Sequence, residues 1–124
     1  MAVNGGFITG TIPKDNLIVG DLHLTDTETL AESQDLTRGA VLGRITTGGQ
    51  MVLSDDGASD GSQVPEMILL EDAVTEAAET LNIPVLVWGQ VNENDLNFGG
   101  THDKDTVKAA LKAVGIYLAK SRPA

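Results

Sequence analysis

Short apolar segments cut by glycine-rich turns fill residues 35–70 and constrain the fold more than any other stretch of the chain. The apolar run at residues 41–46 is followed by a Thr-Gly-Gly-Gln turn, after which residues 50–54 can pair back on it. An acidic loop, residues 54–62, separates this hairpin from a second apolar run at residues 67–70. Runs this short, with turns between them, predict β-strands rather than long helices.

A further strand is predicted at residues 17–30, upstream of that stretch. Leu22 and Leu24 share one face of it, and β-branched threonines alternate with them on the other face. Asp26 and Glu28 fall on the same face as the leucines. Charged residues on that face favour a position at the edge of a sheet.

Residues 71–81 are ambiguous, because their alanine-rich composition favours a helix and four apolar residues could form a weak stripe. A second helix is therefore one interpretation of this segment. From Leu81 onward, apolar side chains alternate to Val87, which predicts a strand with Gly89 near its end. Pro84 argues against a fully central position for this strand, since proline donates no ladder hydrogen bond.

The clearest element is a helix at residues 106–114. Its apolar face is formed by residues at helical spacing, namely Val107, Ala110, Leu111 and Val114. Asp103 or Asp105 can cap the start, and Gly115 stands where a left-handed terminating residue is expected. Residues 116–118 then predict a closing strand. The fold class predicted is mainly β with minor α, as one compact domain.

Composition sets further limits on a chain of 124 residues, which has the length of one domain. Aromatic residues make up only 3%, so Val, Leu, Ile and Ala must fill the core. Cysteine is absent, which excludes disulfides and thiolate metal sites and fits a reducing cytosol. No signal peptide and no membrane-spanning stretch are recognisable, so we expect a soluble protein.

The formal net charge is −10, which argues against a general nucleic-acid binder. No Lys or Arg lies between Arg44 and Lys104, an interval that holds most of the acidic residues. The carboxy-terminal segment is more basic, with Lys108, Lys112 and others. Either the acidic loops maintain solubility, or the molecule is dipolar, with an acidic outer face and a more basic face toward a partner.

The sequence contains no recognisable catalytic or cofactor motif. His23 is expected at the surface of a strand, and His102 beside Asp103 is a poor metal site that more simply begins a helix. The acidic loop fails as a calcium-binding EF-hand, because Ala58 and Met67 occupy two ligand positions. We therefore expect no catalytic, cofactor-binding or metal-binding residues, and no enzyme activity.

Residues 1–16 contain few apolar side chains and several glycines, so they predict a flexible N-terminal arm ahead of a folded domain at residues 17–124. Phe7, Ile8 and Ile12 are too scattered to nucleate a core element. The alternation of this segment nevertheless suits an extended strand once another protein supplies a sheet edge. A disordered tail without function is the alternative.

Five segments in order resemble the lambda-like bacteriophage head decoration protein family. They are NLIVGD at 16–21, LTRGAVLGRIT at 36–46, GASDGSQVPEMILLED at 57–72, VWGQVNENDLNFG at 87–99 and VKAALKAVGIYL at 107–118. The resemblance covers about residues 16–120. Residues 73–81 depart most from the family pattern because their composition is more helical.

This resemblance implies a structural virion protein with the β-clip-like fold of head decoration proteins. Such cement proteins form homotrimers, bind the major capsid protein on the outside of an expanded head at three-fold sites, and stabilise it against internal DNA pressure. They are made in the bacterial host cytoplasm and need no cofactor, nucleic acid or membrane. By this resemblance, the capsid-binding residues of the arm are Phe7, Ile8, Ile12 and Pro13.

A second hypothesis from the acidic composition alone is an intracellular binding module or a nucleic-acid-mimicking inhibitor. A mimic requires a dense, ordered array of carboxylates. Here most of the acidic residues fall in predicted loops and turns. The charge pattern therefore fits a mimic less well than a decoration protein.

Overall fold

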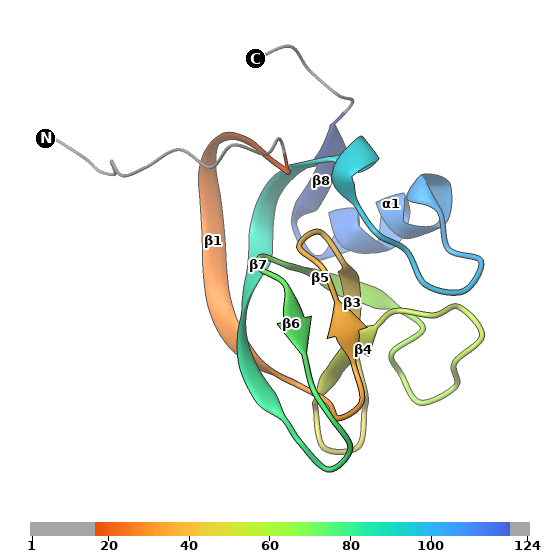
Figure 1. Cartoon of the computed structure of the whole chain (residues 1–124). Helices are drawn as coiled ribbons and strands as arrows, with labels where there is room; N and C mark the ends of the chain where they lie inside the picture. The colour runs from red at the N-terminus through yellow and green to blue at the C-terminus, as the bar shows by residue number, and fades with distance from the viewer. Residues whose placement is uncertain (1–16, 120–124) are drawn as a thin grey trace, which may run out of the picture.

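Two long strands, β1 (Ile18–Leu30) and β7 (Leu81–Asn92), pair antiparallel and form the spine of the protein (Figure 1). The structure is a computed structural model that describes residues 17–119. The remaining elements in chain order are β2 (Asp35–Leu36), β3 (Val41–Arg44), β4 (Met51–Leu53), β5 (Pro65–Leu69), β6 (Ala73–Val74), η1 (Glu93–Asp95), α1 (Lys104–Ala113) and β8 (Ile116–Ala119). The expected class, mainly β with one helix near the C-terminus, is confirmed.

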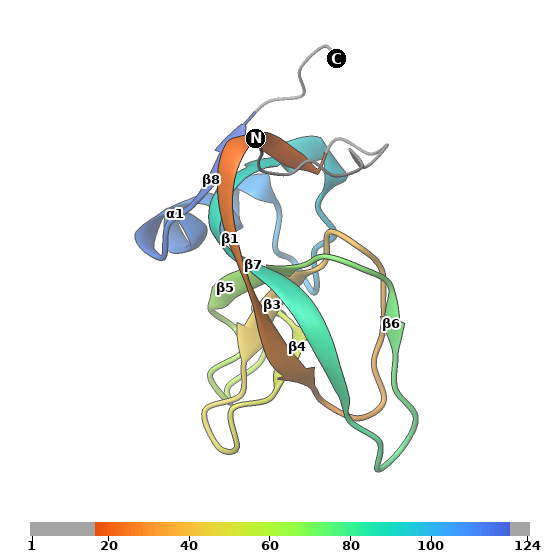
Figure 2. The same ribbon diagram turned by 90° about the vertical axis from the view of Figure 1, so that its left-hand side faces the viewer.

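The main sheet closes on itself. Its strand order is β1-β4-β3-β5-β7-β8, and the additional pairing of β1 with β7 joins the first five strands into a ring (Figure 2). β8 lies outside the ring and runs parallel to β7. One edge of β1 pairs with β7, and the other contacts β4 only at Leu30↔Met51. Most of that other edge therefore has no paired strand among the described residues, which agrees with the edge position predicted for this strand.

Two apolar clusters fill the interior, and their members are aliphatic residues and methionines. One joins the five strands of the ring to β2 and β6 and consists of Leu30, Leu36, Ala40, Leu42, Met51, Met67, Leu69, Ala73, Ile83 and Val85. The other lies under α1 and consists of Leu17, Val41, Ile68, Leu86, Val91, Leu96, Val107, Leu111 and Ile116. Neighbouring residues of β7, Val85 and Leu86, belong to different clusters, so β7 is buried on both faces.

The predicted hairpin and helix are present. Gly48 and Gly49 both have positive φ in the turn between β3 and β4, a conformation that glycine adopts without strain. Asp103 caps α1 by accepting hydrogen bonds from the N–H groups of Asp105 and Thr106. Gly115, with φ of 97°, ends the helix as predicted.

One residue of the predicted helical face lies elsewhere. Val107 and Leu111 are buried in the cluster under α1, whereas Val114 is 44% exposed. The helix ends at Ala113, so the helical spacing no longer applies at Val114. The assignment of Val114 to the buried face was therefore wrong.

The helical interpretation of residues 71–81 is also wrong. Strand β6 pairs with β2, and Ala78 has a φ of 63°, which no α-helix contains. The buried Thr75 holds the segment in place, because its hydroxyl donates to the carbonyl of Ala31 and accepts the N–H of Gln34. These contacts between distant parts of the chain override the helix propensity of the alanines.

Pro84 does not keep β7 at an edge, contrary to the expectation from its missing N–H. β7 pairs with β1, β5 and β8. The carbonyl of Pro84 accepts the N–H of Leu70, the residue just after the end of β5. In a strand the nitrogen and the carbonyl of one residue face the same neighbour, so the Pro84 nitrogen also faces the chain beyond β5. A central strand tolerates proline there because the neighbouring ladder has ended.

Candidate functional site

The predicted capsid-binding residues Phe7, Ile8, Ile12 and Pro13 lie outside the described residues, and so does the whole predicted arm. The structure does show where that segment joins the body. Leu17 is only 2% exposed and packs in the cluster under α1, and its carbonyl accepts the N–H of Asn92 at 2.7 Å. The described part of the chain therefore begins at a buried, hydrogen-bonded residue.

The next pairs of the sheet carry an exposed apolar face, which we define by Leu24, Trp88 and Tyr117. Leu24 of β1 is paired with Trp88 of β7, and Gln90 of β7 is paired with Tyr117 of β8. The three apolar side chains are 57%, 37% and 44% exposed. Gln90, the partner of Tyr117, is next to Val91, the partner of Ile18, whereas Trp88 is three residues from Val91.

Gly115 fixes the position of Trp88 on this face. The indole ring packs so closely on the glycine that a Cβ atom there would clash with it. The N–H of Gly89 donates to the carbonyl of Gly115 at 3.0 Å, which joins the strand of the tryptophan to the end of the helix. Trp88 is therefore packed against the turn that joins α1 to β8.

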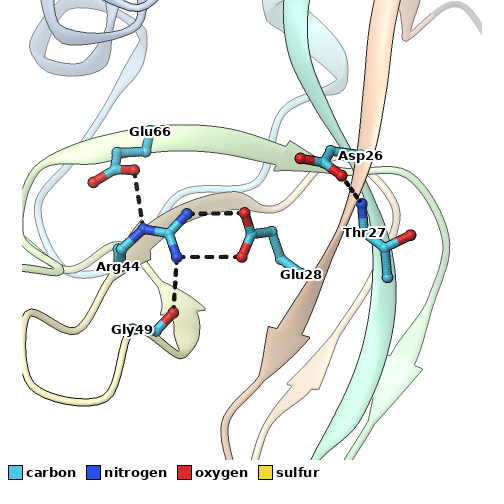
Figure 3. A network of polar contacts seen from close by, with 6 residues as sticks. All are labelled: Asp26, Thr27, Glu28, Arg44, Gly49 and Glu66. Atoms are coloured by element: carbon cyan, nitrogen blue, oxygen red, sulfur yellow. Dashed lines mark hydrogen bonds and ion pairs between the residues drawn. The ribbon is translucent and has the colours of Figure 1, made fainter.

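Arg44 binds two carboxylates on another side of the ring (Figure 3). Its Nη1 and Nη2 donate to the two oxygens of Glu28 at 3.2 and 2.9 Å, and its Nε lies 3.5 Å from Glu66. Nη1 also donates to the carbonyl of Gly49 at 2.9 Å. The hydrogen bonds to Glu28 raise the pKa of the guanidinium. One positive charge is thus shared by two carboxylates, and the network links β1, β3 and β5.

The acidic loop is held by its own carboxylates. Asp56 accepts hydrogen bonds from the hydroxyl and the N–H of Thr101, which lower the pKa of this carboxyl. Asp60 accepts from the hydroxyl and the N–H of Ser62, with the same effect on its pKa. These carboxylates bind nearby donors and do not converge. Residues 17–119 contain no group of three or more potential metal ligands.

The two histidines have different surroundings. His23 is exposed on β1, as predicted. His102 contacts the hydroxyl of Thr106 through Nδ1 at 2.9 Å and the carbonyl of Gln63 through Nε2 at 3.0 Å. Both ring nitrogens of His102 are thus engaged, and the residue joins the start of α1 to the end of the acidic loop. Among residues 17–119 as a whole, no helix is long and apolar enough to cross a bilayer.

A sheet body whose described part begins at the buried Leu17 and that carries an exposed apolar face is compatible with a binding scaffold. The family model of bacteriophage lambda head decoration protein D matches residues 7–117. The chain belongs to this family. A search of curated proteins found no match.

The predicted family is thus confirmed, and with it a structural role on the phage head. A decoration protein binds the capsid and resides at the surface of the virion head. The family is structural rather than catalytic, which favours this role over an acidic inhibitor or binding module. The matched residues begin at Phe7, so they include all four predicted residues of the arm.

The exposed apolar face was not predicted from the sequence. Trp88 and Tyr117 were assigned to strands, and strand membership alone does not say which face meets solvent. A signal was nevertheless available, because these are the single tryptophan and the single tyrosine of the chain. Aromatic residues this rare are more informative when they lie in separate strands that a sheet can bring together.

Proposed function

We propose that this protein is a homotrimeric cement protein that binds the outside of an expanded phage head at its three-fold sites and stabilises the shell against DNA pressure. The family assignment supports this function. Its partners would be the major capsid protein and two further copies of itself. The protein would be made in the cytoplasm of the bacterial host and would need no cofactor or nucleic acid.

The anchored position of Leu17 is the observation that carries this proposal. If residues 1–16 form the arm that grips the shell, the load on the arm passes into a buried side chain and a backbone hydrogen bond. A root buried in the core transmits force to the whole domain. A loosely attached arm would extend under load and would reinforce the shell poorly.

In this proposal the arm adds a strand to a sheet edge of the capsid protein. Its backbone supplies the hydrogen bonds, Phe7, Ile8 and Ile12 fill apolar pockets, and Pro13 ends the pairing. Ordering the arm costs roughly 1–2 kcal/mol per residue, so one arm binds weakly by itself. Three arms on one trimer bind with an avidity far above the affinity of each.

Charge limits how the three copies can meet. Each chain carries a formal net charge of −10, so the copies repel one another at long range. Their contacts must therefore be apolar or must bring opposite charges together. Trimer formation and shell binding should both respond to the salt concentration, because exposed charges are screened over about 10 Å at 0.1 M salt.

The direct test is co-sedimentation with expanded, undecorated heads. A variant that lacks residues 1–16 should remain a folded trimer but should no longer pellet with the heads. Phe7→Ala should weaken binding measurably without a change in melting temperature. Wild-type binding by the truncated protein would contradict the arm mechanism, and a lower melting temperature for Phe7→Ala would place Phe7 in the core.

A further inference from the structure

The acidic loop contains two Asp-Gly pairs, Asp56–Gly57 and Asp60–Gly61. In such a pair the glycine nitrogen can attack the carboxyl carbon of the aspartate side chain, because glycine has no Cβ to hinder the approach. The N–H proton and the carboxyl OH leave as water, and the new N–Cγ bond closes a succinimide ring. Water then opens the ring at either carbonyl, which restores aspartate or leaves isoaspartate. Both aspartates are exposed to solvent, so burial does not prevent this reaction.

At Asp56, both reacting groups are hydrogen-bonded to other residues. One carboxylate oxygen accepts the N–H of Thr101 at 2.8 Å, and the other accepts the Thr101 hydroxyl. The N–H of Gly57 donates to Oδ1 of Asp55 at 2.8 Å. The nitrogen and the carboxyl group that it would attack are thus each engaged by a different residue.

At Asp60, the same arrangement recurs with other partners. Its Oδ1 accepts the N–H of Ser62 at 3.0 Å and the Ser62 hydroxyl at 2.5 Å. The N–H of Gly61 donates to Oε1 of Gln63 at 2.8 Å. The Asp60 carbonyl also accepts the N–H of Thr46 at 2.8 Å, and a Cβ atom on Gly61 would clash with the Thr46 hydroxyl. Contacts with Thr46 therefore fix the backbone of this pair as well.

The ionisation of both carboxyl groups adds to this protection. The first step expels the hydroxyl of a protonated carboxyl group, since a carboxylate has no OH to lose. Hydrogen bonds from Thr101 lower the pKa of Asp56, and hydrogen bonds from Ser62 lower the pKa of Asp60. At neutral pH the protonated form is therefore rarer at both sites than in an aspartate without such donors.

We propose that the acidic loop carries two isoaspartate-forming sites that its hydrogen bonds keep unreactive, and that Asp56 reacts first when the loop opens. The donor to Asp60 lies two residues away and moves with it, whereas Thr101 lies 45 residues from Asp56 and is lost when the loop separates from the start of α1. Isoaspartate routes the backbone through the side chain, so the carboxylate that binds Thr101 changes its position. This chemistry depends on the loop contacts alone, whichever partner the protein binds.

Incubation of the whole protein at neutral pH, followed by peptide mapping with electron-transfer fragmentation, measures isoaspartate at each site. The folded wild-type protein should accumulate little at either aspartate, whereas the protein in urea should accumulate it at both. Thr101→Val should raise the rate at Asp56 by about tenfold, because a hydrogen bond to a charged group is lost, and should leave the rate at Asp60 unchanged. Thr101→Ser keeps the hydroxyl and should remain protected.

Gly57→Ala, added to Thr101→Val, tests whether the glycine nitrogen is the nucleophile. A Cβ atom on residue 57 hinders the attack, so the double variant should lose most of the increase. Circular dichroism checks that every variant is folded. Equal rates in folded and urea-unfolded wild-type protein would overturn the protection by the loop. An unchanged rate at Asp56 in folded Thr101→Val would overturn the role of Thr101.

Discussion

Arg44 of β3 and Glu28 of β1 form a two-pronged ion pair between strands that no ladder of backbone hydrogen bonds connects. In the strand order, β4 lies between them, and β4 touches β1 at a single residue pair. The ion pair therefore closes the ring of strands at its weakest junction. It is the side-chain complement of the Leu30↔Met51 contact.

Glu28→Gln should lower the free energy of unfolding by about 1 kcal/mol, since the pair is partly buried and its geometry is two-pronged. Glu66→Gln is the matched control. Its oxygen lies 3.5 Å from Arg44, so its loss should matter less. Urea unfolding at one fixed protein concentration measures both. An effect of Glu66→Gln equal to or larger than that of Glu28→Gln would contradict this ranking.

Gly115→Ala should lower the free energy of unfolding by about 2–4 kcal/mol, because it combines a strained positive φ with a clash against the Trp88 ring. Gly48→Ala isolates the strain. It has a similar φ of 92° but open space around it, so about 1 kcal/mol is expected. Thermal unfolding followed by Trp88 fluorescence compares them. Equal losses would show that the ring does not pack on Gly115 as described.

Thr75→Val should destabilise the protein by about 1–3 kcal/mol, because it leaves the carbonyl of Ala31 and the N–H of Gln34 without their buried partner. Valine has nearly the same shape, so the loss reports the hydroxyl rather than a cavity. Hydrogen exchange should also become faster in β2 and β6. Thr80→Val, at an exposed position in the same segment, should change neither measurement.

Acid should release the contact between the acidic loop and the start of α1. The pKa of Asp56 is lowered in the folded protein by the hydrogen bonds from Thr101, so its stabilising effect is complete above the ordinary pKa of about 4. The effect is lost as the pH falls through the lower, folded value. NMR titration of the Thr101 amide should follow this transition. In Asp56→Asn the amide should no longer respond to acid, and an unchanged response would assign the effect to another group.

The sequence predicted elements that depend on interactions between neighbouring residues, and it failed where contacts between distant residues decide the structure. The helix start at Asp103 and its end at Gly115 were predictable because capping and helical spacing are local. Residues 71–81 were misread because the contacts of Thr75 reach a segment more than 40 residues earlier in the chain. No pattern within the segment itself records those contacts.

The candidate binding surfaces also differ in how much of each the sequence could predict. The four residues proposed to bind the capsid were predicted with the help of a family resemblance, and the burial of Leu17, which follows the proposed arm, came only from the structure. The apolar face depends on the pairing of Leu24 with Trp88 after an irregular stretch of β1. Strand registers with such shifts are fixed by tertiary packing, so sequence alternation alone could not place these side chains together.

The most direct measurement is the composition of purified phage particles, determined by quantitative mass spectrometry of virions that contain DNA. A decoration protein should be present at a copy number comparable with that of the major capsid protein. Partial removal of the protein should make the heads lose DNA at lower temperature. Its absence from purified virions, while it remains abundant in the lysate, would contradict the function proposed for this protein.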